Sequence, residues 1–277
     1  MLVYNDTIMK NPSSLLLSAA LLAAPSFAQS WNNGAPVIEA QTPLRPPSGG
    51  NVAGQFDSYT FTMSWEPTFC EGKPNAQECA SQRPDRFDAS NLALHGLWPD
   101  KDGDASHSYG YCGVSSSDQS LDRAPTWCQL REPAYSDATH AALAIVMPGI
   151  NSCLDHHEWT KHGTCSGLTA DQYFATASAY VQAVAASSFG QYLKAHAGQT
   201  VDSSAVVAAF EQDFGAGSGA KLVLNCTSVR GASDLLEVRL HLPNPLRPAS
   251  ELSAMLLATG DRGNCPSSFL LDPIPSH

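Results

Sequence analysis

Alternating apolar and polar residues mark strands near both ends of the main part of the chain. From residue 58 to 65, every second residue is large and apolar, and the residues between are serine or threonine. The same period recurs from residue 235 to 242, where Glu237, Arg239 and His241 lie on the polar face. Successive side chains of a strand point to opposite faces, so both stretches predict half-buried strands. Shorter apolar runs predict further strands at residues 91–95, 221–226 and 269–271.

Helical periods occupy the middle of the chain. We expect helices from Ser136 to about Met147, from near Thr169 onward, and from Asp202 or Ser203 to Phe214. Residues 101–134 have little periodicity and predict a long loop region. Strands first, helices in the middle and strands last predict an α+β fold rather than a parallel wound sheet.

The most reactive stretch, residues 155–165, reads Asp-His-His-Glu-Trp-Thr-Lys-His-Gly-Thr-Cys. In a helix, about 100° per residue would place four reactive side chains on one arc and turn Trp159 toward a core. These four are His157, Glu158, Lys161 and His162. A zinc-protease helix has histidines at i and i+4, but lysine occupies that position after the first of these histidines. The spacing therefore favours metal-free acid and base catalysis, with a solvated helix face of no function as the plain alternative.

A second segment, Leu94 to Asp100, reads Leu-His-Gly-Leu-Trp-Pro-Asp and follows a short apolar run. His95 is therefore expected at the end of a buried strand, beside a glycine that permits close approach. Together, the two segments resemble the active-site segments of the T2-type ribonucleases. The resemblance extends from about Phe56 to Leu271 and implies a single domain with a central, mainly antiparallel sheet, flanked by helices and stapled by disulfides.

The resemblance assigns the chemistry to four residues. It implies that His162 is the general base and His95 the general acid of the first step, and that they exchange roles when water opens a cyclic phosphate. Which histidine starts as the base rests on the family alone. Lys161 is expected to stabilise negative charge on the phosphate, and Glu158 to orient Lys161 or His162.

Three further residues are expected to bind substrate. His157 matches a family position that contacts phosphate, and Trp98 and Asp100 match positions that bind a base. The indole offers a stacking face and the carboxylate accepts hydrogen bonds. The alternative for Trp98 is a core tryptophan packed under the cleft. Because the 2′-hydroxyl is the internal nucleophile, we expect cleavage of RNA and none of DNA.

The N-terminal residues predict export from the cell. Residues 9–28 contain a lysine, an apolar run and small residues before Ala28, so we expect a signal peptide over residues 1–28, with Met9 as a candidate true start. A flexible arm would follow over residues 29–55, and the catalytic domain over residues 56–277. This arrangement predicts a secreted or periplasmic protein.

The eight cysteines predict four disulfides in an oxidising compartment, and sequence alone leaves 105 pairings open. The resemblance implies three pairs and leaves a fourth. They are Cys70 with Cys79, Cys112 with Cys165, Cys226 with Cys265 and, as the remaining pair, Cys128 with Cys153.

The formal net charge of −11 argues against stable, non-specific binding of nucleic acid. A small cationic cleft can still hold one phosphate, so we expect weakly bound RNA as the substrate. We expect a monomer with no cofactor, no metal, no DNA partner and no membrane partner. The first reading is a metal-independent endoribonuclease that forms a 2′,3′-cyclic phosphate and then a 3′-phosphate. The alternatives are a non-catalytic secreted RNA-binding or inhibitory module on the same fold, and a zinc hydrolase.

Overall fold

The computed structural model describes residues 51–101, 109–124, 126–229 and 231–273. The chain divides into units of residues 1–43 and 44–277, and every described residue belongs to the second unit. The expected signal peptide and the arm up to residue 50 lie outside the described residues. In the described ranges, no helix has both the length and the apolar character needed to cross a lipid bilayer.

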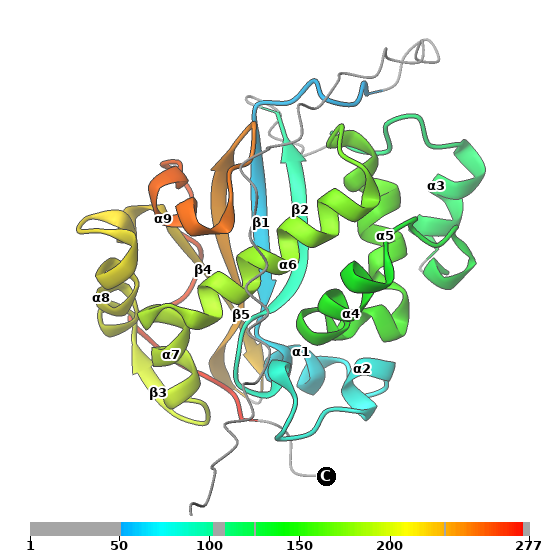
Figure 1. The fold of residues 1–277 in the computed structure, drawn as a ribbon. Helices are drawn as coiled ribbons and strands as arrows, with labels where there is room; N and C mark the ends of the chain where they lie inside the picture. The colour runs from blue at the N-terminus through cyan, green and yellow to red at the C-terminus, as the bar shows by residue number, and fades with distance from the viewer. Residues whose placement is uncertain (1–50, 102–108, 125, 230, 274–277) are drawn as a thin grey trace, which may run out of the picture. The chain divides into compact units, whose positions relative to one another are not determined.

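A mainly antiparallel sheet of six strands forms the centre of the fold (Figure 1). Five strands run in the order β2-β1-β5-β6-β3, and β4 pairs with β5. The pairing is antiparallel except for one parallel contact between β5 and β6. The strands are β1 (Ser58–Ser64), β2 (Ala93–Asp100), β3 (Thr200–Asp202), β4 (Leu222–Val229), β5 (Ala232–Pro243) and β6 (Ser268–Leu270). The α+β prediction is confirmed, as are the predicted strands.

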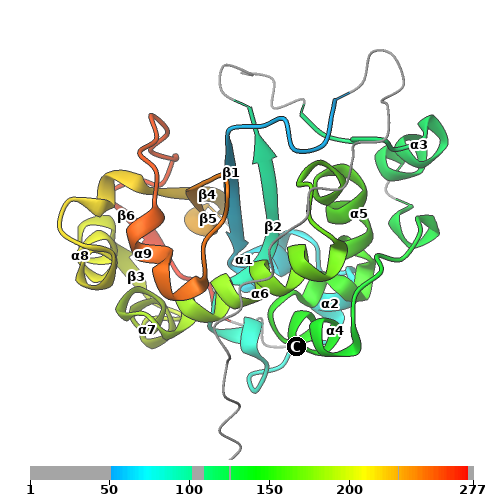
Figure 2. The ribbon, with the colours of Figure 1, turned by 45° about the horizontal axis from the view of Figure 1, so that its top comes forward.

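Helices cover one face of the sheet and flank both of its sides. The longest, α6, crosses the sheet, while α4 and α5 lie beside β2 and α7 and α8 lie on the side of β3 (Figures 1 and 2). The helices are α1 (Glu66–Gly72), α2 (Gln77–Ala80), α3 (Ser116–Arg123), α4 (Asp137–Val146), α5 (Leu154–Lys161), α6 (Ala170–Ala186), α7 (Ser188–Ala195), α8 (Ser203–Phe214) and α9 (Leu252–Met255). The predicted helices correspond to α4, α6 and α8.

The two faces of the sheet differ in chemistry. On the helix-covered face, Phe61 of β1 pairs in register with Leu97 and Leu240 and meets the Tyr180 ring of α6 at 5.7 Å. On the opposite face, Thr60 pairs with Trp98 of β2 and His241 of β5. The first face therefore forms the core, and the second face carries the polar groups of a cleft.

The stretch expected to be a long loop contains a helix. Helix α3 lies inside residues 101–134, and the Ser115 side chain caps it by accepting a hydrogen bond from the Asp118 N–H. A serine followed three residues later by an acid is a helix-start signal, and it overrides the weak periodicity. Pro67 lies in the first turn of α1, where its missing N–H costs nothing.

Candidate active site

A β-bulge brings His95 and Trp98 to the same face of β2. Thr62 of β1 pairs with Gly96, and the next residue pairs with Leu94, so His95 is the extra residue between them. In a regular strand, residues three apart point to opposite faces. The extra residue of the bulge interrupts this alternation, so the side chains of His95 and Trp98 both reach the cleft.

His95 reaches across β1 to a carboxylate on β5. Its Nδ1 lies 2.8 Å from Oε1 of Glu237, and Oε2 of the same carboxylate accepts a 2.6 Å hydrogen bond from Arg239. Burial alone would lower the pKa of His95, but the hydrogen bond to Glu237 and the nearby Glu158 raise it above its usual value. This environment favours the protonated imidazolium.

His162 caps the C-terminal end of α5 in a different environment. It is 8% exposed, and its Nδ1 has no hydrogen-bond partner among the described residues. Burial, followed by the charges of Lys161 and His157, holds the pKa of His162 well below its usual value. This environment favours the neutral imidazole, which can accept a proton.

The Trp98 ring lies between these two histidines and is held by a hydrogen bond to Glu158. It stacks on His162 with 5.2 Å between ring centroids and meets His95 edge-on at the same distance. Its Nε1 donates a 2.7 Å hydrogen bond to Oε2 of Glu158. A side-chain carbon at Gly96 would lie 2.1 Å from that oxygen, so the glycine makes room for the bond. Trp98 is therefore part of the cleft and not a core residue.

Glu158 is fully buried beneath the site. Its Oε1 lies 4.0 Å from Nε2 of His95 and 3.8 Å from Nε2 of His157, and has no hydrogen-bond partner in the described ranges. Burial raises the pKa of Glu158, although His95 and His157 oppose the rise. The Glu158 carboxyl thus contacts His95, His157 and Trp98.

His157 is held by a residue of α3. Its Nδ1 lies 2.7 Å from Oδ1 of Asp122, and its ring stacks on Trp127 with 4.6 Å between the ring centroids. Asp122 also accepts a hydrogen bond from the Tyr111 hydroxyl. Burial alone would raise the pKa of Asp122, but the bonds from His157 and Tyr111 lower it. The second nitrogen of His157 is thereby turned toward Glu158.

Lys161 supplies a cation at the end of α5. Its side chain is half-buried, and its ammonium group makes no hydrogen bond or ion pair with any residue that the structure describes. Its charge lowers the pKa of Asp122 and His162, which places it near both sides of the cleft. Among the described residues, this charge is therefore available to an anionic ligand.

Two cavities adjoin the histidines. His95 lines a cavity of about 630 Å³, together with residues of β1, α1 and the β4–β5 hairpin. His162 lines a cavity of about 320 Å³ that also contains Trp98 and Asp100. Because both histidines contact Trp98, the cavities lie next to each other. The expected binding residues Trp98 and Asp100 therefore share one pocket, in which Tyr109 forms another wall.

Comparison with known proteins shows the family of this chain. The model of the ribonuclease T2 family matches residues 56–252. The chain belongs to this family. It is 28% identical to Ribonuclease I of Escherichia coli (strain K12) over 235 residues, which cover 79% of the chain and 87% of that relative. It is 32% identical over 127 residues to a ribonuclease of Aeromonas hydrophila, covering 46% of the chain and 45% of the relative. The solved structure of ribonuclease MC1 from bitter gourd seeds matches with a TM-score of 0.47 at 20% identity, covering 78% of the chain and all of that structure.

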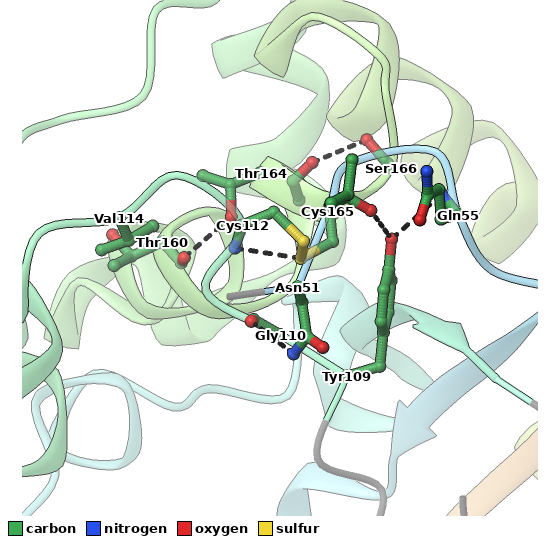
Figure 3. Close-up of a disulfide and its surroundings, with 12 residues drawn as sticks. Asn51, Gln55, Tyr109, Gly110, Cys112, Val114, Thr160, Thr164, Cys165 and Ser166 are labelled. Atoms are coloured by element: carbon green, nitrogen blue, oxygen red, sulfur yellow. Dashed lines mark hydrogen bonds between the residues drawn. A yellow bond between two sulfur atoms is a disulfide. The ribbon is translucent and has the colours of Figure 1, made fainter. Parts of the chain in front are cut away.

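Four disulfides staple this T2-family domain, in the pairs that the resemblance implies. Cys112–Cys165 joins the loop after β2 to the segment that follows α5 (Figure 3), and Cys128–Cys153 joins the Trp127 turn to the start of α5. The others are Cys70–Cys79 and Cys226–Cys265. Both ends of the reactive helix are thus cross-linked to the segments that carry its neighbours.

The last five residues of the expected arm are attached to this region. Asn51 donates a hydrogen bond to the Gly110 carbonyl, and Gly54 donates one to the Cys165 carbonyl. The Tyr109 hydroxyl bonds the Val52 carbonyl and accepts a bond from the Gln55 N–H (Figure 3). Hydrogen bonds therefore hold residues 51–55 against the loop after β2 and the segment after α5.

One group in the T2-family site could hold a metal ion. Ligand atoms of His157, Glu158 and His162 lie within 4.8 Å of one another. The Lys161 charge already lowers the pKa of His162, and it would likewise oppose a cation there. The donors suit zinc, but the electrostatics of the group favour an anion.

Several residues of this site escaped the sequence reading. Asp122 and Trp127 fall in a stretch expected to be loop, and Glu237 and Arg239 were noted only as the polar face of a strand. The sequence of β5 did contain a signal for Glu237 and Arg239. Burying a charged pair on a strand costs free energy unless the pair is solvated or has a functional role. Strand order, which sequence did not supply, was needed to bring Glu237 beside His95.

Proposed function

We propose that this chain is an exported, metal-independent endoribonuclease that cleaves single-stranded RNA through a 2′,3′-cyclic phosphate. Family membership makes the chain a ribonuclease. The observation that carries the finer proposal is that His95 and His162 meet at one tryptophan with pKa values shifted in opposite directions. Such a pair suits the two proton transfers of phosphoryl transfer without a metal.

In the first step, His162 removes the proton of the ribose 2′-hydroxyl. The 2′-oxygen then bonds to phosphorus while the bond from phosphorus to the 5′-oxygen breaks. His95 gives its proton to that departing oxygen. The products are a 2′,3′-cyclic phosphate and an RNA fragment with a free 5′-hydroxyl.

In the second step, the roles are reversed. His95, now neutral, takes a proton from water, whose oxygen attacks phosphorus. The bond from phosphorus to the 2′-oxygen breaks, and His162, now protonated, returns the proton to it. The product is a 3′-phosphate, and both histidines regain their starting states.

The neighbouring groups bind the phosphate and the base and position the residues that transfer protons. Lys161 is the uncommitted cation that stabilises charge building up on the phosphorus oxygens. His157, held by Asp122 at Nδ1, contacts the phosphate with its other nitrogen. Glu158 fixes Trp98 and keeps His95 charged. Trp98 and Asp100 bind the base on the 5′ side of the cleaved bond.

The four disulfides support an oxidising destination, outside the cytosol. The net charge of −11 supports weak, rapidly released substrate. A single site built within one domain supports a monomer as the active species.

The test is cleavage of a short RNA and its all-deoxy counterpart in excess EDTA at mildly acidic pH. We expect cleavage of the RNA alone, with a 2′,3′-cyclic phosphate that appears before the 3′-phosphate. Sensitivity to EDTA would favour a metal at His157, Glu158 and His162. Binding without cleavage by correctly oxidised protein would favour the non-catalytic module.

A further inference from the structure

The larger cavity contains an acid that the proposed mechanism does not use. Glu66 is the first residue of α1 and lines the 630 Å³ cavity together with His95. Phe69 and Trp127 provide aromatic surface in the same cavity. Its volume is in the range of small-molecule sites and exceeds what a nucleobase needs. The cavity lies on the side of His95, the histidine that protonates the departing oxygen.

Two polar residues that line this cavity have side chains without a hydrogen-bond partner among the described residues. Glu66 is 7% exposed, and its carboxyl group makes no hydrogen bond with any described residue. The hydroxyl of Thr68, which is 1% exposed and lines the same cavity, also has no hydrogen-bond partner in the described part of the chain. Buried polar groups are nearly always hydrogen-bonded, so the unpartnered carboxyl of Glu66, which lines the cavity, points to a ligand.

Burial keeps the Glu66 carboxyl neutral at mildly acidic pH. It raises the pKa of Glu66 to about 8, with Asp88 and Glu78 adding to the rise and His95 and Arg86 opposing it. Two further charged residues, Lys73 and Glu237, line the cavity. A neutral carboxyl offers one donor and one acceptor side by side, whereas the ionised form offers acceptors alone.

We propose that Glu66 is a specificity-determining residue that hydrogen-bonds the Watson–Crick edge of the base on the leaving nucleotide. This inference rests on the proposed function, because it needs the 5′-oxygen to depart beside His95. The neutral acid matches any base that has a donor next to an acceptor. The ionised acid matches guanine best, because guanine alone presents two adjacent donors on that edge, N1–H and the N2 amino group.

The first test compares uridylyl-adenosine with the methyl ester of uridine 3′-phosphate, which has no leaving base. Wild type, Glu66→Gln and Glu66→Leu are assayed at pH 6, with thermal unfolding to verify folding. We expect Glu66→Leu to lower the preference for the dinucleotide over the methyl ester about tenfold, which is in the range of one bidentate base contact. Glu66→Gln should retain it, because the amide also offers a donor beside an acceptor.

The matched control is Glu132→Leu, the same change at an exposed acid outside both cavities. It should keep the wild-type preference. An unchanged preference in Glu66→Leu, or an equal loss in Glu66→Gln, would overturn the inference. If wild type cleaves neither substrate nor uridine 2′,3′-cyclic phosphate, the proposed function itself fails.

The second test uses pH, because a purely structural role of Glu66 would not make the preference between leaving bases depend on pH. The ratio of cleavage rates for a guanosine over an adenosine leaving group should rise in wild type as the pH increases through about 8. In Glu66→Gln the ratio should stay flat, since the amide does not ionise. The same pH dependence in both proteins would contradict the assignment.

Discussion

The two histidines of the cleft are held by opposite means. His95 projects from a bulged strand and bonds the Glu237 carboxylate, while His162 ends a helix and is buried with an unpartnered Nδ1. Carboxylates raise the pKa of His95, whereas burial and the neighbouring Lys161 lower that of His162. The same side chain is thus prepared as an acid in one place and as a base in the other.

This difference supplies a physical reason for an assignment that the sequence drew from the family alone. Where the environments of two titratable groups move their pKa values apart, the group with the higher value suits the acid role and the group with the lower value the base role. The surroundings of the two histidines thus support the proposal of His95 as the first general acid and His162 as the first general base. Trp98 contacts both rings and so keeps the pair at a fixed spacing.

The largest expected effect comes from removing either histidine. His95→Ala and His162→Ala should each lower kcat/KM on RNA by about 10²–10⁴-fold. Uridine 3′-(4-nitrophenyl phosphate) separates the roles, because its leaving group departs without an acid. On this ester, His95→Ala should recover most of its loss and His162→Ala should not.

The control for these variants is His140→Ala, at an exposed histidine of α4 that lines neither cavity. It should cleave RNA at the wild-type rate. Recovery by His162→Ala on the aryl ester, with none by His95→Ala, would reverse the assignment of acid and base.

A smaller effect is expected from Glu237→Gln, which keeps the shape of the contact and removes its charge. The pKa of His95 should fall, so His95 loses its proton at lower pH. The alkaline limb of the kcat/KM profile should move to lower pH, with a loss of about tenfold at neutral pH, the equivalent of one pKa unit. An unshifted alkaline limb would show that Glu237 does not govern the acid.

Much of the fold and of the catalytic set could be predicted from local sequence. Alternation revealed β1 and β5, and the two motifs named both histidines, Glu158 and Lys161. The pairing of His95 with Glu237 could not be predicted, because it depends on β1 lying between β2 and β5. The bulge at His95 also depends on pairing with β1, and no periodicity within β2 reveals it.

The smallest effect should appear in the pH dependence of folding stability. For His95, the raised folded-state pKa contributes stability that is fully present below the unfolded value of about 6.5 and is lost as pH rises through the folded value. For His162, the lowered pKa contributes stability that is present above about pH 6.5 and is lost as pH falls through the folded value. Relative to wild type, His95→Ala should therefore lose stability on acidification, and His162→Ala should gain it. Urea unfolding of the three proteins at several pH values between 5 and 8 measures both slopes, and parallel curves for the two variants would mean that their environments do not differ as the geometry requires.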